Sequence, residues 1–361
     1  MQIQNSNRQS NIELLRILLM IAILNYHLML YNGVWFHEYN TNTLIGIMIS
    51  VIGAIPADYC FIAMSSYFLL KENEKPCGHL FGKLPVYKKS IHRFWRFLTL
   101  CLSMYVIKVL VLRGLFGYNN KEYFVDVFLM KGAWWYVYPY LCLLLAYPYL
   151  NKLMQKINSI IHLMLVAFLG LGFIWISYRN ETIFVYDLWG FLFDYVLVAY
   201  ILRKDGESLS RRFYGVCSGI CAGFLLGCCI FVCVPYHNVS LEQGHYVISL
   251  LVGRYSFPAV LMGIFTFFFV LKSKIPYKKW INKIASITMF VFLLHDTWMG
   301  VFWYLGKCDN QYVYYSTPTF IFWGVMFVAT AFLVSGIIGT IYKSKIQPLW
   351  EKAIRDENEV E

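Results

Sequence analysis

The chain has 361 residues, of which 59% are hydrophobic, 19% aromatic and only 14% charged. A soluble domain carries about 25% charged residues, so this composition excludes an ordinary soluble protein. Apolar runs recur along the whole chain, and each is long enough to cross a hydrocarbon core of about 30 Å. We therefore expect an all-α, polytopic transmembrane protein, with one domain over residues 1–361 and short cytoplasmic tails at 1–11 and 343–361.

In chain order, the apolar runs predict ten transmembrane helices. The first is a retained helix rather than a signal peptide, because it lacks an A-x-A cleavage site and contains Arg16 and His27. In the second, Gly53 and Pro56 are expected to break the helix just before Asp58, as is tolerated where a helix lines a polar cavity. The ten ranges are 12–31, 44–70, 94–112, 134–150, 159–178, 184–202, 213–235, 257–271, 285–305 and 317–342.

The net charge of +11 is distributed in a way that argues for membrane orientation rather than nucleic-acid binding. Segments 71–96, 203–212 and 272–283 hold seven, four and five Lys or Arg residues, whereas the opposite loops together hold six. By the positive-inside rule this alternation predicts an even number of spans, with both termini in the cytoplasm. No nucleic-acid partner is expected.

Segment 71–96 has two interpretations of equal weight. Its aromatic and basic residues alternate at helical spacing, which is typical of an interfacial amphipathic helix, but solvated orientation charge explains them as well. Arg93 and Arg96 lie one turn apart and could make forked contacts to phosphate. Farther on, Gly215, Gly219, Gly223 and Gly227 repeat every four residues, which predicts a face for close helix packing.

Ionisable residues inside the spans carry the functional information, because they are costly in lipid. Arg16 and His27 are eleven residues apart, so they share a helix face, with a rise of about 16 Å between them. Counted from the cytoplasmic ends of their spans, Asp58 and His295 lie about 20 Å and about 18 Å deep. A single histidine is more often structural than catalytic, but three such side chains at one depth favour a site made of His27, Asp58 and His295.

Other intramembrane charges have structural explanations. Lys108 and Asp194 are expected to form an ion pair, with Asp187 on the same face as Asp194, and Glu13 competes for Arg16 from three residues away. The chain has no HExxH motif and its histidines are scattered, so no metal site is expected.

At these residues the chain resembles the acyltransferase-3 family, bacterial integral-membrane O-acyltransferases of surface polysaccharides. Five segments resemble family motifs in the same order, although Ser66 stands where the family usually has glycine and no proline follows the arginine cluster. The segments are RILLMIAILNYH from Arg16 to His27, PADYCFIAMSSYFLL around Asp58, KKSIHRFWRF with Arg93 and Arg96, WWYVYPYLCLLLAYPYL, and SITMFVFLLH ending at His295.

The resemblance implies transfer of an acyl group, typically acetyl from acetyl-CoA, to a hydroxyl of a cell-surface glycan or its lipid-linked precursor in the bacterial cytoplasmic membrane. It assigns His27 as the general base, Asp58 as the group that holds its tautomer or charge, and His295 as a positioning residue. It assigns Arg16, Arg93 and Arg96 to the phosphates of CoA. From the residues alone, a glycan-lipid flippase is the main alternative, since flippases also place polar residues at the membrane midplane.

Overall fold

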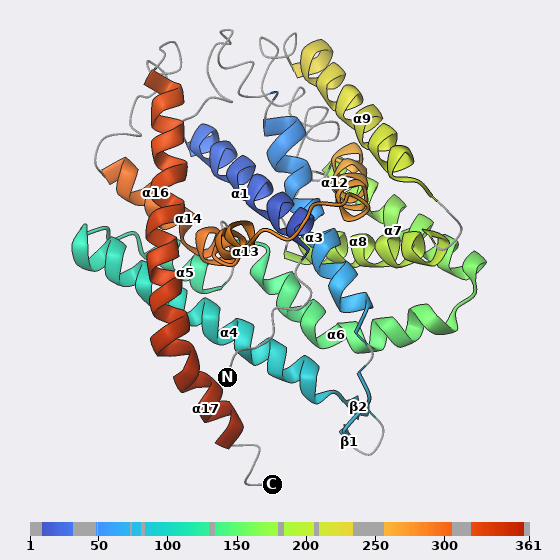
Figure 1. Ribbon diagram of the computed structural model, residues 1–361, viewed down its shortest axis with the longest axis horizontal. Coiled ribbons are helices and arrows are strands. Elements are labelled where there is room, and N and C mark those ends of the chain that lie inside the picture. Colours follow the sequence, from blue (N-terminus) through green and yellow to red (C-terminus); the bar gives the residue numbers. More distant parts are fainter. Residues whose placement is uncertain are drawn as a thin grey trace.

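The fold is seen in a computed structural model, which is almost entirely helical (Figure 1). It describes residues 9–31, 48, 50–72, 74–80, 84–129, 134–179, 184–205, 209–233, 256–304 and 319–356. The α-helices are α1 (Ser10–Tyr31), α3 (Ile55–Leu70), α4 (Lys88–Val109), α5 (Lys121–Phe128), α6 (Val137–Lys156), α7 (Ser159–Arg179), α8 (Phe184–Asp205), α9 (Arg211–Cys228), α12 (Phe257–Leu271), α13 (Lys279–Ala285), α14 (Thr288–Tyr304), α16 (Thr319–Ile341) and α17 (Gln347–Asp356). Wider π-helical turns form η2 (Ser50–Ala54), η3 (Leu110–Leu115), η5 (Cys229–Cys233) and η6 (Tyr342–Ile346).

The prediction of an all-α polytopic membrane protein is confirmed. A helix lies in each of the ten ranges that the apolar runs predicted. Within the described ranges, six helical segments are long and apolar enough to cross a membrane, namely Ser10–Leu28, Val51–Leu70, Lys88–Leu115, Ser159–Ile176, Arg211–Phe231 and Gly324–Lys352. The count of ten spans and the cytoplasmic location of both termini stay predictions.

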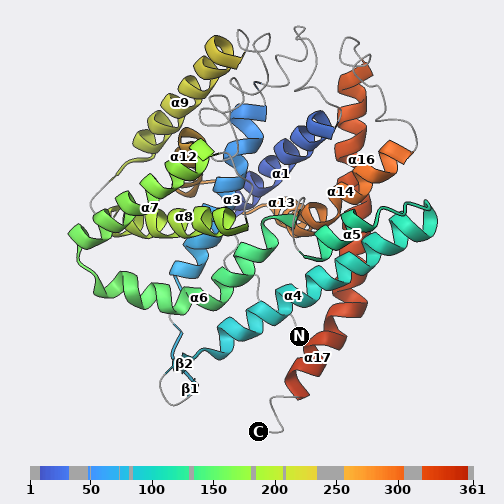
Figure 2. The ribbon, with the colours of Figure 1, turned by 180° about the vertical axis from the view of Figure 1, so that it is seen from behind.

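Helices α1 and α3 form the centre of the molecule. Helices α7, α8, α9 and α12 lie on one side of them, and α14 and α16 lie on the other, as both ribbon views show (Figures 1 and 2). Helix α12 approaches α3 very closely at Gly263, where an added Cβ would lie 2.5 Å from the carbonyl oxygen of Pro56. The start of α1 is tied to the end of α12, because the Asn11 amide donates to the carbonyl oxygens of Val270 and Ser273 at 2.7 and 2.8 Å.

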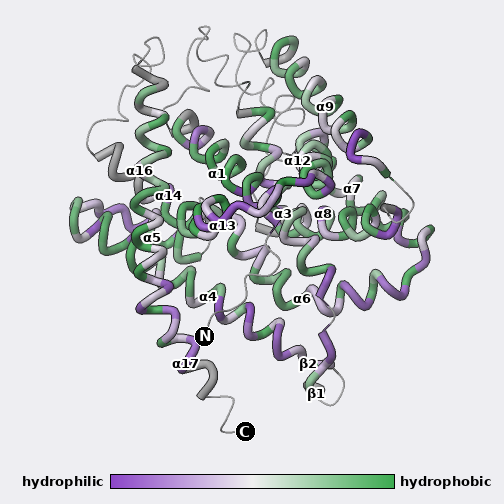
Figure 3. The backbone as a smooth tube through the Cα atoms, in the orientation of Figure 1, coloured by the Kyte–Doolittle hydropathy of each residue, from purple (hydrophilic) through white to green (hydrophobic). Residues whose placement is uncertain are grey.

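Hydrophilic residues gather along α17, the first turns of α4 and the end of α6, whereas the faces of α9 and α16 are largely hydrophobic (Figure 3). This separation is expected for helices that are embedded in lipid and end in a polar layer. It brings the basic segment that contains Lys88 and Lys89 to the same end of the molecule as α17.

One local prediction needs correction. Residues 50–70 are not broken before Asp58; instead the π-helical turn η2 runs directly into α3, with Pro56 in the first turn of α3. Pro56 has no N–H to donate to the preceding turn, and it lies at the junction where the helix changes from π to α.

The described part of segment 71–96 is helical only in its second half, where Ile91, Phe94 and Trp95 lie in α4 and confirm the predicted helical spacing. It contains an antiparallel hairpin of β1 (Gly78–Leu80) and β2 (Leu84–Val86), with Gly78 opposite Val86, and then the start of α4. The carboxylate of Glu74 accepts from the backbone N–H groups of Lys89 and Ser90, so an acidic side chain caps α4 where the helix dipole favours negative charge.

The predicted glycine face on α9 is only partly used. A Cβ at Gly215 would lie 3.1 Å from the ring of Phe269 on α12, so this glycine does permit close packing. Added Cβ atoms at Gly219, Gly223 and Gly227 would meet no described atom within 4 Å. Helix α9 also packs against α12 through the hydroxyls of Ser218 and Thr266, 2.8 Å apart, so the expected four-glycine packing face is wrong for the other three glycines within the described structure.

Candidate active site

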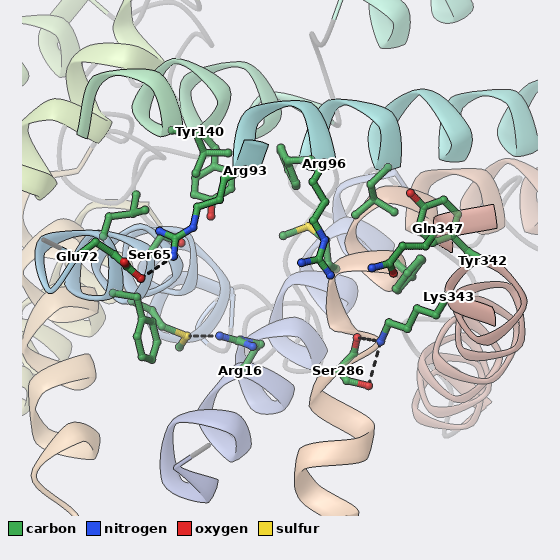
Figure 4. Close-up of a pocket in the computed structure, with 18 residues that line it drawn as sticks. Arg16, Ser65, Glu72, Arg93, Arg96, Tyr140, Ser286, Tyr342, Lys343 and Gln347 are labelled. Carbon is green, nitrogen blue, oxygen red and sulfur yellow. Dashed lines mark hydrogen bonds and ion pairs between the residues drawn. The ribbon is translucent and has the colours of Figure 1, made fainter. Parts of the chain in front are cut away.

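A cationic cavity of about 480 Å³ lies between α1, α3, α4, α14 and the η6–α17 segment. Arg16, Arg93 and Arg96, which were predicted to bind one ligand, all line it, and their side chains point toward its centre (Figure 4). Lys343 adds a fourth cation, whereas Glu72 is the one carboxylate among the described lining residues. The net positive lining favours an anionic ligand.

Carboxylates hold the three arginines in place. Arg93 donates to Glu72 at 2.5 Å, and Lys89, one turn earlier in α4, contacts the same carboxylate. Burial alone would raise the pKa of Glu72, but the hydrogen bonds from Lys89 and Arg93 outweigh it and lower the pKa below the ordinary value of 4.5. Glu72 is therefore ionised at neutral pH and keeps Arg93 fixed at the cavity wall.

The other two arginines have looser partners. Arg16 donates to Glu13 at 3.1 Å and contacts the sulfur of Met64 at 3.4 Å, so the predicted competition by Glu13 is confirmed as a contact. Arg96 lies 3.8 Å from Glu351 on α17, and its side chain is 58% exposed. Arg96 is thus the arginine most easily drawn to a ligand.

A second cavity of about 220 Å³ continues from the first toward the protein interior. Asp58 and Phe292 line only this deeper cavity, and Arg16 lines both. The hydroxyls of Ser65 and Tyr136, 2.8 Å apart, also belong to its wall. The residues shared by the two cavities are Arg16, Met64, Ser65, Tyr140, Ser286 and Met289.

The structure brings His27 and His295 together, as the depth argument predicted. Their ring centroids are 4.6 Å apart, with His27 half-buried on α1 and His295 fully buried on α14. Nδ1 of His295 lies 2.5 Å from the carbonyl oxygen of Phe292. Because a carbonyl only accepts, Nδ1 carries the proton, which leaves the lone pair of a neutral ring on Nε2.

Phe292 connects this histidine pair to the deeper cavity. Its side chain lines that cavity, and its ring centroid is 5.8 Å from that of His295. Asp58, the third predicted catalytic residue, reaches the same cavity from α3. Within the described ranges, no three His, Cys, Asp or Glu side chains come together as ligands for a metal ion.

The predicted Lys108–Asp194 ion pair is wrong. Lys108 instead pairs with Asp296, with Nζ 2.6 and 2.5 Å from its two carboxylate oxygens, and Tyr123 donates to the same carboxylate at 2.8 Å. Both Lys108 and Asp296 are buried. The partner differs from the predicted one because α4 packs against α14, whereas α8, which carries Asp194, packs against α3, α6 and α7. The carboxylate oxygens of Asp194 have no hydrogen-bond partner among the residues described.

Sequence reasoning missed two groups next to the site. Asp296 directly follows His295, and the run LLHDTW places this charge inside an apolar span, which was a usable signal. Lys343 and Gln347 line the larger cavity, although residues 343–361 were expected to form only a tail. No pattern in the sequence indicates that the helix continues from α16 through η6 into α17 and packs there against α4.

The fold and these cavities define a class, namely polytopic helical membrane proteins in which a cationic cavity leads toward a pair of histidines within the membrane-spanning helices. A family model described as an acyltransferase domain matches residues 9–341, nearly the whole chain. The chain therefore belongs to the acyltransferase-3 family and is a membrane acyltransferase, as the motifs indicated. No curated protein and no solved structure matches it.

Proposed function

We propose that this acyltransferase moves an acetyl group from acetyl-CoA to a hydroxyl of a cell-surface glycan, or of its lipid-linked precursor, in the bacterial cytoplasmic membrane. One observation carries the proposal: two continuous cavities, cationic at one end, contact Phe292 beside the His27–His295 pair at the other. This arrangement suits a donor with an anionic head and a reactive group on a long arm.

The cationic cavity is the proposed site for the phosphates of CoA. Arg93 and Arg96 come from adjacent turns of α4, and Arg16 faces them from α1 (Figure 4). The planar guanidinium groups of arginines match phosphate oxygens with paired hydrogen bonds, which a lysine cannot reproduce. A volume of about 480 Å³ also falls within the range of about 300–1,000 Å³ that is usual for ligand sites.

The proposed place of reaction is the inner end of the deeper cavity, at Phe292, beside the histidine pair. His27 would remove the proton of the acceptor hydroxyl as the hydroxyl oxygen attacks the thioester carbonyl. The thiolate of CoA would then leave and take up the proton that His27 had removed. Asp58 would hold the charge or tautomer of His27, and His295, itself fixed by the Phe292 carbonyl, would orient the His27 ring. The hydroxyls of Ser65 and Tyr136 are candidates to donate to the developing oxyanion.

The test measures release of free CoA thiol from acetyl-CoA by the purified protein in lipid nanodiscs that contain membrane glycan. His27→Ala is expected to lose about 10²- to 10⁴-fold of the transfer rate per folded molecule, the usual contribution of a general base. Its affinity for acetyl-CoA should be unchanged, because the proposed phosphate ligands are intact.

His162→Ala is the matched control. His162 is also a histidine within a helix, but it lies on α7, away from the proposed site. It is buried, and its Nε2 lies 3.0 Å from the carbonyl oxygen of Val196. Its loss should lower stability and leave transfer per folded molecule unchanged. Normal transfer by His27→Ala would exclude His27 as the base, and glycan-independent thiol release at the full rate would contradict a glycan acceptor.

A further inference from the structure

The end of the chain contributes to the cationic cavity. Lys343 on η6 and Gln347 on α17 both line it, although they follow the last residue, 341, that the family model matches. Lys343 crosses to the turn between α13 and α14, where Nζ donates to the carbonyl oxygen of Ser286 at 2.9 Å and to its hydroxyl at 3.3 Å (Figure 4). Ser286 itself lines both cavities. Lys343 is exposed, and these two hydrogen bonds hold its ammonium group against the wall of the cavity.

The same segment also carries an opposing charge. Glu351, one turn beyond Gln347, accepts from the Gln347 amide at 2.7 Å and lies 3.8 Å from Arg96. Helix α17 packs against α4, so this carboxylate reaches one of the three arginines that face the cavity. A phosphate placed between Arg96 and Lys343 would have to compete with Glu351 for Arg96.

We propose that the η6–α17 segment is a working part of the acyl-donor site: Lys343 binds a phosphate of the acyl-CoA, and Glu351 weakens donor binding by competing for Arg96. The inference rests on the proposed function, because it takes acyl-CoA as the ligand of the cationic cavity. It adds a cation and an opposing carboxylate from outside the family-matched residues. CoA carries both a phosphomonoester and a diphosphate, and the anionic phosphate oxygens of either one could bind Lys343.

The test compares charge-removing variants on one short segment. Lys343→Gln is expected to raise the KM for acetyl-CoA about tenfold, the loss of one hydrogen bond between charged groups, with kcat unchanged. Lys345→Gln is the matched control, because it removes the same charge two residues away from a side chain that does not line the cavity. Glu351→Gln should shift KM in the opposite direction, lowering it about two- to fivefold.

Further variants separate binding from folding and identify the phosphate. Lys343→Arg keeps the cation and should retain most of the donor affinity if charge, rather than the packing of η6, is what matters. With acetyl-dephospho-CoA as donor, the Lys343→Gln effect disappears if Lys343 binds the terminal phosphomonoester, and persists if it binds the diphosphate. Either result supports the inference.

Equal KM values for the Lys343→Gln and Lys345→Gln variants would overturn the inference. Arg93→Lys distinguishes that failure from a failure of the proposed function, since it keeps the charge but loses the paired hydrogen bonds. If Arg93→Lys raises the donor KM and Lys343→Gln does not, the cavity binds acyl-CoA without the C-terminal segment. If neither variant changes the donor KM, acyl-CoA does not bind in this cavity at all.

Discussion

The buried Lys108–Asp296 pair makes a strong and asymmetric prediction about stability. Lys108 is fully buried and donates to both oxygens of Asp296, which also accepts from the Tyr123 hydroxyl and, at 3.0 Å, from the Thr297 backbone N–H. Removing one partner leaves the other charge buried and uncompensated, which costs about 3–5 kcal/mol in the free energy of unfolding. We expect Lys108→Met and Asp296→Leu each to show a loss of this size.

The double variant should behave differently from the sum of its parts. With both charges gone, neither desolvation penalty remains, so Lys108→Met combined with Asp296→Leu should lie within about 1–2 kcal/mol of the parent protein. The assay is reversible unfolding of the purified protein in mixed micelles of a mild and a denaturing detergent, followed by tryptophan fluorescence. Additive losses in the double variant, or single losses below about 1 kcal/mol, would refute the assignment of a buried ion pair.

The Arg96–Glu351 pair provides the internal control, because it is also an ion pair but has side chains 58% and 34% exposed. Exposed pairs contribute about 0–1 kcal/mol, so Glu351→Gln should hardly change the free energy of unfolding. The position of Asp296 next to His295 adds a second readout. The single variants that still fold should also lose transfer rate, because the pair anchors α14 to α4 beside the histidine.

Two further predictions concern the cavity wall and the packing of the centre. The pKa of Glu72 is lowered in the folded protein, so its contacts with Lys89 and Arg93 stabilise the fold above the unfolded-state pKa and are lost as the pH falls through the folded-state pKa. The difference in thermal midpoint between the parent and Glu72→Gln should therefore shrink between about pH 7 and about pH 3. A difference that stays constant over this range would contradict the prediction. Gly263→Ala places a Cβ 2.5 Å from the Pro56 carbonyl oxygen and should lower the free energy of unfolding by about 1–3 kcal/mol. The control Gly219→Ala adds a Cβ that meets no described atom within 4 Å, so it should be neutral or slightly stabilising. Equal effects of the two variants in detergent unfolding would show that α12 and α3 do not approach so closely.

Much of the fold was predictable because a lipid environment imposes simple rules on a sequence. Apolar length and periodicity located helices in all ten expected ranges, and the rarity of intramembrane charge directed attention to Arg16, His27 and His295. Depth could be counted along each helix, and the spacing placed His27 and His295 at one level, which their contact requires. These inferences need only the geometry of one helix at a time.

Lateral neighbours could not be predicted in the same way. Asp194 and Asp296 are both acidic residues inside apolar spans, and depth alone does not tell which of them faces Lys108. The choice depends on α4 packing against α14, which is a property of side-chain shapes along the helix surfaces. The same limit explains Lys343, because only the packing of α17 on α4 turns a basic residue near the chain end into part of a cavity.

The proposed reaction gives the eleven-residue spacing on α1 a physical meaning. Arg16 lines both cavities, whereas His27 contacts His295 beyond Phe292, so one helix links the anion-binding end to the proposed base. Eleven residues return to nearly the same helix face after a rise of about 16 Å. A spacing of ten or twelve would turn the imidazole by about 100° away from the face that carries Arg16. A rigid helix can therefore hold a donor's phosphates and its reactive carbonyl at a constant separation, which is what acyl transfer from a long-armed donor requires.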